Sequence, residues 1–399
     1  MAECVEVAKF EDTFIGVVAK GVEDNECLSF KLSDFPSYVQ VKKTPCCFIT
    51  LPLSNFGRPF LEHPTMPEMV YELQNHEDNW DKFAYYLCNG NEGDTIRRCG
   101  LRSSALTVKE YFAGAGGSHE AYKSKGFEVY CLVEKDDIAV KSLVANNAKD
   151  ESKIYHGCVA DALNQHNEHG TPPDACHFSP PCCGFSRANR YGGANDKNNN
   201  DLSLLFVKML HVDKPKVACF ENVTGMWRRK FVHYLLNIIA GSLKEGYQVR
   251  CSKLNTSNYG DPQSRNRLFL LASMNGLPLP LFPPKRYGEG LLPAVTVGHV
   301  MKKSEDDDIC SLPEQVTRLR PDKPAPTIIA QGRQPLHPFE GRMISVQDML
   351  VLMSLPPRTF AVKGSRKERR RQVGNMIPFK TMSSIAEEMK SVVEFHYDI

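Results

Sequence analysis

The sequence of 399 residues lacks several features that would assign it to a class at once. Its 14 cysteines include no Cys-X-X-Cys pair, which argues against a structural zinc site. No apolar run is long enough to span a membrane, and the first residues do not have the shape of a signal peptide. The formal net charge is only +2, so bulk charge does not announce a nucleic-acid partner. We therefore expect no metal and no membrane, and nucleic-acid binding would have to come from local patches.

The cysteines lie singly or in two adjacent pairs, Cys46-Cys47 and Cys182-Cys183, many of them within apolar runs. Such thiols indicate a reducing compartment, the nucleus or the cytosol, rather than a disulfide framework. A hydrophobic content of 42% and a charged content of 24% are ordinary for a globular protein with a large core. No internal repeat is visible, and the length predicts two or three domains.

The character of the chain changes near residue 104. Residues 1–103 mix two short β-like runs, Tyr38–Val41 and Cys46–Leu51, with charged turns, and we predict an N-terminal extension or a small accessory domain. In residues 104–272 short apolar runs alternate with helical patterns, which predicts an α/β fold with a mainly parallel sheet. The expected strands are Ala105–Phe112, Glu128–Val133, Ala175–Phe178, Val217–Phe220, Val249–Leu254 and Leu268–Ala272. The expected helices are Asp137–Asn147, Asp201–His211 and Phe231–Glu245.

That alternation stops after residue 272. Residues 273–344 are rich in Pro and Gly, and we predict a separate small lobe there. Helical patterns return at Ser345–Met353 and Pro378–Phe395, so residues 345–399 are predicted to return to the core.

A glycine-rich turn, Phe112–Gly117, follows the first expected strand of the core. Glycines there let the backbone turn sharply and approach a ligand closely. Glu134 ends the next expected strand, where an acidic residue commonly accepts hydrogen bonds from ribose hydroxyls. No Gly-Lys-Ser/Thr follows the glycines, so an adenosyl ligand without phosphates, S-adenosylmethionine, fits better than a dinucleotide. A simple tight turn is the alternative.

A second polar turn, Ser179–Ser186, reads S-P-P-C-C-G-F-S and follows a buried strand. A cysteine is nucleophilic as its thiolate, and two prolines fix the turn that presents Cys182. Residues 184–200 are rich in Gly and Asn, and we expect a structureless, mobile lid there. Glu221, at the end of the strand Val217–Phe220, is a candidate proton partner.

Two arginines, Arg265 and Arg267, precede the last expected strand at positions i and i+2. On an extended segment they share one face and can present donors to a carbonyl oxygen or a phosphate. Two surface arginines without a ligand are the alternative.

Six blocks of the chain together resemble the DNA (cytosine-5) methyltransferases. In chain order they are FAGAGG at 112–117, Glu134, PPC at 180–182, ENV at 221–223, QSRNR at 263–267 and QVGN at 372–375. All six occur in that family in this order, and the resemblance covers roughly residues 106–395. It implies a Rossmann-like, S-adenosylmethionine-dependent methyltransferase sheet with a small target-recognition lobe.

The resemblance also implies roles for single residues. Cys182 would attack C6 of a flipped-out cytosine, Glu221 would contact N3 and the exocyclic amine, and Arg267 would bind O2 with support from Arg265. C5 would take the methyl group from S-adenosylmethionine, with S-adenosylhomocysteine as the second product. The implied cofactor contacts are Phe112, Ala113, Gly114, Gly116, Gly117, Glu134, Lys135, Cys158, Pro181 and Asn375.

Several positions differ from the family pattern. Cys183 stands where the family usually has Gln, and Cys158 stands where it has an adenine-contacting Asp, with Asp161 three residues later. Lys135 takes a position often held by a residue that packs on the adenine, and Asp348 replaces a usual Glu. The joint retention of the nucleophile, the carboxyl group and the O2-binding arginine favours an active enzyme over a catalytically inactive regulator that binds DNA.

Ser273–Gly341 occupies the position of the target-recognition region, and its short length favours a short target such as CpG. Two basic clusters, Trp227–Lys230 and Lys363–Arg371, are candidates for phosphate contact; the second fits a nuclear import signal or a solvated loop equally well.

The leading interpretation is a DNA methyltransferase in the nucleus, with the cytoplasm as the alternative location. An RNA methyltransferase of the same superfamily typically carries Pro-Pro-Cys-Gln-Pro-Phe-Thr and a Cys-Phe-Thr tripeptide, neither of which occurs here. The sequence indicates no protein partner, oligomeric state or target context.

Overall fold

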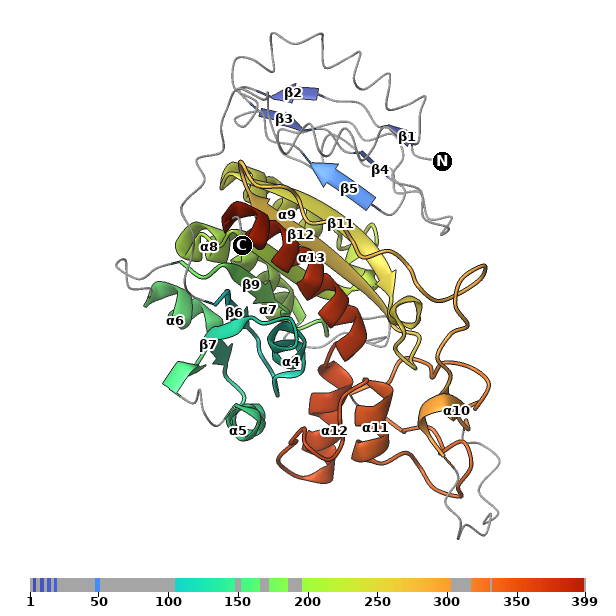
Figure 1. Cartoon of the computed structure of the whole chain (residues 1–399). Coiled ribbons are helices and arrows are strands. Elements are labelled where there is room, and N and C mark those ends of the chain that lie inside the picture. Colours follow the sequence, from blue (N-terminus) through green and yellow to red (C-terminus); the bar gives the residue numbers. More distant parts are fainter. Residues whose placement is uncertain are drawn as a thin grey trace.

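A ten-stranded sheet runs through the molecule in the order β1-β4-β5-β11-β12-β10-β9-β6-β7-β8 (Figure 1). This computed structural model describes five short strands within residues 3–50 and then a larger set of ranges. The larger set comprises residues 105–147, 152–165, 172–185, 196–302, 317–330 and 332–397. The expected strand Tyr38–Val41 lies outside the described residues.

The strands after residue 104 form the part of the sheet that the alternating pattern predicts. They are β6 (Thr107–Tyr111), β7 (Glu128–Glu134), β8 (Ile154–His156), β9 (Ala175–Phe178), β10 (Val217–Val223), β11 (Tyr247–Asn255) and β12 (Asn266–Met274). Five of them, β10, β9, β6, β7 and β8, are parallel, and β12 lies antiparallel between β10 and β11. The predicted α/β fold is confirmed.

The described strands of the N-terminal region extend this sheet at its β11 edge. They are β1 (Glu3–Cys4), β2 (Ala8–Phe10), β3 (Thr13–Ile15), β4 (Val18–Ala19) and β5 (Cys47–Thr50). β5 pairs antiparallel with β11, β4 pairs with β5 and β1 with β4, while β2 and β3 form a separate pair. The domain limits drawn at residues 103, 272 and 344 stay predictions.

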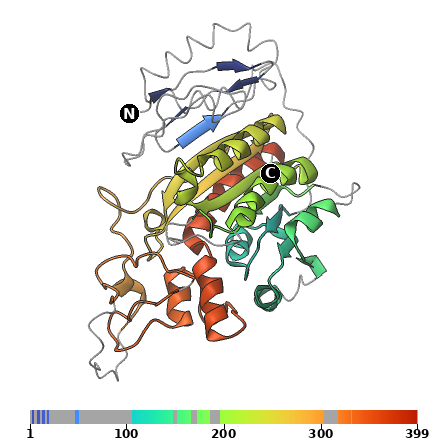
Figure 2. The ribbon, with the colours of Figure 1, turned by 180° about the vertical axis from the view of Figure 1, so that it is seen from behind.

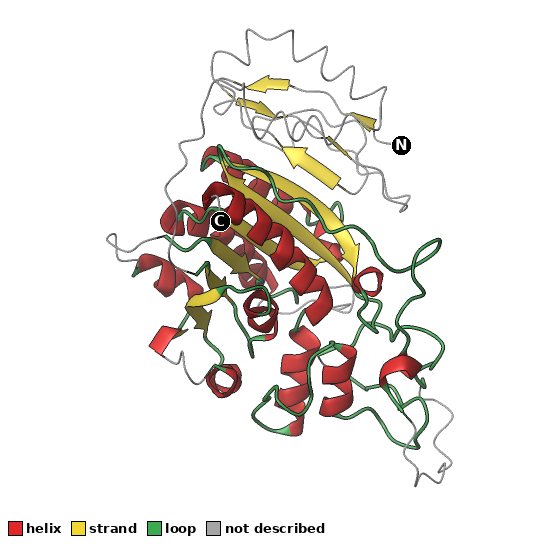
Figure 3. Ribbon diagram, in the orientation of Figure 1, coloured by secondary structure: helices red, strands yellow, loops and turns green. Residues whose placement is uncertain are grey.

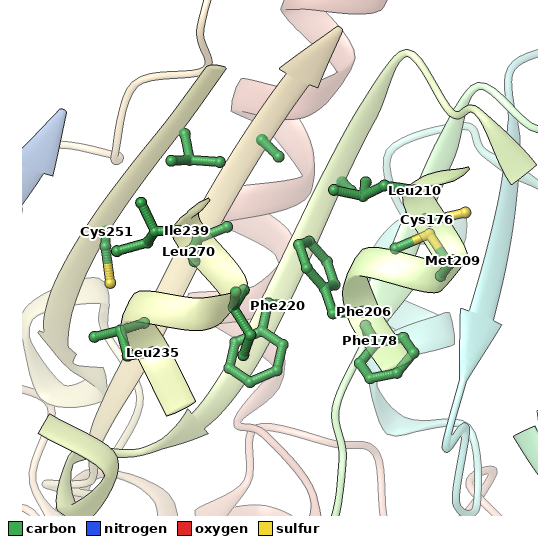
Figure 4. Packing of buried hydrophobic residues seen from close by; sticks show 14 of the residues in the cluster. Cys176, Phe178, Phe206, Met209, Leu210, Phe220, Leu235, Ile239, Cys251 and Leu270 are labelled. Carbon is green, nitrogen blue, oxygen red and sulfur yellow. The ribbon is translucent and has the colours of Figure 1, made fainter. Parts of the chain in front are cut away.

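One face of the sheet is covered by α6 (Val159–Asn164), α8 (Leu205–Asp213) and α9 (Val232–Lys244). Figure 2 shows α8 and α9 in front of the strands. Because side chains alternate along a strand, every second residue of β9 and β10 meets these helices. Figure 4 shows Phe178, Phe206 and Phe220 in this layer, and their ring centroids lie 5.5–6.3 Å apart.

The opposite face is covered by α4 (Gly117–Lys123) and the long C-terminal helix α13 (Phe379–Tyr397), which crosses the sheet in Figure 1. The alternate strand residues Cys219 and Leu271 are buried here with Met382 and Met389 of α13. α5 (Asp137–Asn146) begins where the Asp136 carboxylate accepts two backbone N–H groups, which is a standard N-cap.

A lobe made mostly of loops lies beyond one end of the sheet (Figure 3). It contains α10 (Val297–Val300), α11 (Val346–Leu352) and α12 (Arg366–Asn375), which share a hydrophobic cluster of their own. Ala115, from the turn after β6, belongs to the same cluster. Gln263 ties the lobe to the core, because its amide donates to Leu352 O (3.2 Å) and accepts from Ile328 N (3.0 Å).

Two predictions about local structure need correction. Residues 184–200 were expected to be structureless, yet Asp196–Asp201 form α7 and continue through a 3₁₀ turn, Leu202–Leu204, into α8. Residues 186–195 of the expected lid lie outside the described residues. The basic cluster Lys363–Arg371 could be interpreted from the sequence as a solvated loop. In the structure Arg366 begins α12, because Ser365 and Glu368 form a capping box. Among the helices described, none has the length and apolar character needed to cross a membrane.

Candidate active site

The glycine-rich turn after β6 is built from left-handed backbone. Phe112, Gly114 and Gly116 have φ angles of 59°, 58° and 90°. Glycine adopts these angles at little cost, whereas other residues are strained there. A Cβ added to Gly114 would have no atom within 4 Å, so this position faces open space. A Cβ on Gly117 would lie 3.1 Å from Met376, so the C-terminal segment closes the turn from the other side.

Ala113 and Glu134 join this turn to the end of β7. Ala113 is buried, and its N–H donates to Val133 O (3.0 Å). Glu134 Oε2 accepts the N–H of Gly114, and Oε1 accepts those of Lys135 and the next residue, all at 2.8 Å. An ionised carboxylate has about four acceptor positions, so Glu134 keeps one for a ligand hydroxyl. Lys135 itself is exposed.

Cys158 lies where β8 ends, at the N-cap of α6. Its thiol donates to Asp161 Oδ2 (2.9 Å), and its sulfur accepts the Asp161 N–H (3.4 Å). The predicted Cys158 position thus carries a carboxylate beside the thiol. Asp161 is exposed in the first turn of α6, so its carboxylate could accept a hydrogen bond from the amine of a ligand.

Glu221 lies near the carboxyl end of β10 and is only 6% exposed. Its Oε1 lies 3.0 Å from Arg267 Nε of β12, and its Oε2 accepts a hydrogen bond from Ser179 Oγ at 2.6 Å. The antiparallel pairing of β10 and β12 therefore sets the arginine beside the carboxyl group, as the sequence predicted for a shared site. Ser179 contributes a contact that the sequence reasoning did not assign.

Cys182 is partly exposed in the turn after β9, next to the exposed Cys183. Pro181 beside it is also partly exposed, and Asn222 Nδ2 donates to the carbonyl oxygen of Pro180 at 3.4 Å. Burial raises the pKa of the Cys182 thiol, and this rise outweighs the lowering by the nearby guanidinium groups. The thiol is thus held as the acid, and its proton must leave when the sulfur attacks.

Arg265 is 2% exposed and donates to two backbone carbonyls, Ile328 O and Gly374 O, both at 2.9 Å. Burial, and then the neighbouring Arg267, lower its pKa to about 9. Both hydrogen bonds go to backbone oxygens of the lobe, so Arg265 stabilises the chain around the site. Asn375, the residue after Gly374, is exposed at the end of α12.

Comparisons with known proteins identify a family for this chain. Residues 106–320 match the family model described as C-5 cytosine-specific DNA methylase. Type II methyltransferase M1.HphI of Haemophilus parahaemolyticus is 25% identical over 324 residues, which cover 71% of this chain and 86% of that protein. M.AplI of Arthrospira platensis is 26% identical over 320 residues, with 73% and 87% covered.

A solved structure shows the same fold. It is a DNA modification methyltransferase encoded within an Escherichia coli prophage, with a TM-score of 0.59 at 18% identity. The match covers 72% of this chain and 99% of that chain.

Proposed function

The chain belongs to the C-5 cytosine-specific DNA methylase family, and from that premise we propose that it methylates C5 of cytosine in DNA through a covalent bond between Cys182 and C6. S-adenosylmethionine would supply the methyl group as an electrophilic carbon on its sulfonium. The observation that carries the proposal is the convergence of three side chains at one edge of the sheet: Cys182 follows β9, Glu221 lies near the carboxyl end of β10, and Arg267 lies at the start of the antiparallel β12.

The residues of the donor turn fit an adenosylmethionine ligand. Gly114 faces open space, so a ligand can approach the protein backbone closely at this position. Glu134 keeps one acceptor position for a ribose hydroxyl, and Asp161 can accept from the adenine amine. Phe112 is half-buried, with its ring edge against Phe178 (centroids 5.2 Å apart), and it can line the same space.

The chain's own groups account for activation of the base. C5 of cytosine is a poor nucleophile until a group adds at C6. The Cys182 thiol loses its proton to a base, and its sulfur bonds to C6 while Glu221 holds N3 and Arg267 holds O2, so that the electron pair of the 5–6 double bond moves toward C5. After C5 has been methylated, a base removes the C5 proton, the Cys182–C6 bond breaks and the 5–6 double bond returns. The target base must leave the stack, because these atoms are inaccessible inside a duplex.

Arg229 and Lys230 supply a surface for the DNA backbone. Both are exposed immediately after the 3₁₀ turn η5 (Thr224–Trp227), which continues from β10 and Glu221. Basic side chains beside a catalytic cleft neutralise phosphates and make binding dependent on salt.

The proposal can be tested by trapping the intermediate. The protein is incubated with tritiated S-adenosylmethionine and either a DNA duplex or a tRNA that carries 5-fluorocytosine. Fluorine at C5 blocks release, so a covalent adduct should survive a denaturing gel. We expect an adduct with DNA. An adduct with tRNA alone would move the protein to RNA substrates, and no adduct with either would contradict the covalent mechanism.

The adjacent cysteines offer a matched pair of variants. Cys182→Ser should abolish both the adduct and methyl transfer, because the serine hydroxyl is a far weaker nucleophile than a thiolate. Cys183→Gln should retain both, because Cys183 is exposed beside the attacking residue and is not assigned a step. Activity that survives in the Cys182 variant would show that the nucleophile is misassigned.

A further inference from the structure

The nucleophile turn is closed and anchored at Phe185. The N–H of Phe185 donates to Cys182 O (3.1 Å), which makes a tight turn of the cysteine and the two residues that follow it. The Phe185 side chain is fully buried. Its ring meets the rings of Phe231 and Tyr234 edge-on, each with centroids 5.3 Å apart. The position of Phe185 therefore determines where the Cys182 backbone lies.

The carbonyl of Phe185 is held by Arg228. Arg228 Nη2 donates to Phe185 O at 2.8 Å, and Nε donates to Gly225 O at 3.3 Å. The guanidinium also lies 5.6 Å from the centroid of the Phe231 ring. A planar group that donates in two directions bridges the nucleophile turn and the η5 turn, which a lysine cannot reproduce.

Gly225 makes this bridge sterically strict. A Cβ on Gly225 would lie 1.9 Å from Phe185 O, so the two backbones approach more closely than any side chain permits. The Phe185 carbonyl oxygen thus lies directly against Gly225 of η5. It accepts a hydrogen bond from Arg228, which follows Gly225 by three residues. Loss of the guanidinium leaves a carbonyl in a crowded place without that donor.

The same short segment also fixes the other side of the cysteine. Asn222 Nδ2 donates to Pro180 O, and Glu221 precedes it. Residues 221–228 therefore carry the catalytic carboxyl group and tie down the chain both before and after Cys182. We propose that Arg228 is a positioning residue that sets the distance between the Cys182 sulfur and the base held by Glu221, an inference that rests on the proposed function.

This role differs from phosphate contact, which the basic run Trp227–Lys230 suggests for all its members. Arg228 is half-buried and its donors point to backbone oxygens of the protein, whereas Arg229 and Lys230 are exposed. Removing a side chain that contacts phosphate lowers the salt dependence of DNA affinity. Removing a side chain that only forms hydrogen bonds within the protein leaves that dependence unchanged. The two roles can be separated by measurement.

The test compares Arg228→Ala and Arg228→Lys with the wild type, and uses Lys244→Ala, an exposed change at the far end of α9, as the control. The assays are the rate of adduct formation on 5-fluorocytosine DNA, kcat, the KM for DNA and the slope of DNA affinity against salt. We expect Arg228→Ala to slow adduct formation and kcat about 100-fold, the size reported for a displacement of about 1 Å in an active site. DNA KM and the salt slope should stay within twofold of the wild type.

Arg228→Lys should recover little of the rate, because an ammonium group cannot donate in both directions at once. Gly225→Ala is the second variant: it keeps Arg228 but forces Phe185 O away, so it should show the same kinetic pattern. The double variant should be no slower than either single one. Melting temperature and cofactor binding check that each variant is folded.

Three results would overturn the inference. They are normal adduct formation in folded Arg228→Ala, full rescue by lysine, or a reduced salt slope with unchanged kcat, which would make Arg228 a phosphate contact. Each presupposes that wild-type protein forms the adduct. If it does not, the proposed function itself fails, so the two failures are distinguishable.

Discussion

A buried carboxyl group outside the catalytic cleft should make stability depend on pH in an unusual direction. Asp261 is fully buried where the loop after β11 meets the start of α13. Its Oδ1 accepts from Ser354 Oγ (2.7 Å) and Lys380 N (3.2 Å), and its Oδ2 accepts from Thr381 N (3.0 Å) and Oγ1 (2.5 Å). Asp261 thus ties together the lobe, the core and the last helix.

Burial raises the pKa of Asp261 from an ordinary 3.8 to about 6, although four hydrogen bonds act to lower it. The folded protein therefore binds a proton that the unfolded chain has released between about pH 4 and pH 6. Stability falls with rising pH wherever the folded state binds more protons. The stabilising contribution of Asp261 is fully present below pH 3.8 and is lost as pH rises through about 6. Above that pH this group no longer changes the free energy of unfolding. The difference between the two pKa values corresponds to about 3 kcal/mol.

Asp261→Asn removes this titration while keeping the side-chain shape. Urea unfolding would give the free energy of unfolding of both proteins at intervals between pH 4 and pH 7.5. Because other groups titrate in both, the difference between the two isolates Asp261. We expect wild type to lose about 2.4 kcal/mol relative to the variant as pH rises from 4 to 7, because about 0.5 kcal/mol is already lost at pH 4. Glu128→Gln, an exposed change measured in the same way, serves as the surface-charge control. A flat difference for Asp261→Asn, or one that grows in favour of wild type, would refute the reasoning.

Two further predictions concern the core and the donor site. Lys109→Met should lower the free energy of unfolding by about 3–5 kcal/mol in urea, because it leaves the buried Asp213 carboxylate without the ammonium that lies 2.8 Å away. A double variant, Lys109→Met with Asp213→Leu, should recover most of that loss, and an equally unstable double variant would contradict the ion-pair explanation. Glu134→Ala should weaken S-adenosylmethionine binding in calorimetry without changing DNA affinity measured in its absence, whereas Glu128→Ala on the same strand should leave both unchanged. Unaltered cofactor affinity in Glu134→Ala would remove that residue from the site.

The sequence predicted the strands well where they are buried on both faces. Val217–Phe220 and Ala175–Phe178 are continuous apolar runs, and such runs are typical of the interior of a parallel sheet. It missed β8, because three residues, Ile154–His156, give no measurable periodicity. It also missed α6, because the six residues Val159–Asn164 are too few to show a helical period.

The site could be predicted in its residues but not in its contacts. The motifs and the family resemblance named Cys182, Glu221 and Arg267 as candidates, and the pairing of β10 with β12 places Glu221 beside Arg267. Nothing in the spacing showed that Ser179 would donate to Glu221, or that Arg228 would reach back to the nucleophile turn. These contacts arise between segments forty residues apart, and local pattern carries no information about which side chains meet across such a separation.

The two arginines of the QSRNR block show why identical residues two positions apart need separate assignments. Alternation on an extended segment gives them one face, and the family resemblance implies O2 binding for Arg267 with support from Arg265. Arg267 meets the carboxylate of Glu221, which leaves it at the edge of the reacting space. Arg265 is buried and meets two backbone carbonyls of the lobe, Ile328 O and, in α12, Gly374 O. Its burial is costly unless those contacts are worth keeping. Gly374 lies two residues before Met376, which covers Gly117, so the hydrogen bonds of Arg265 join the segment before β12 to the lobe and to the chain beside the glycine-rich turn.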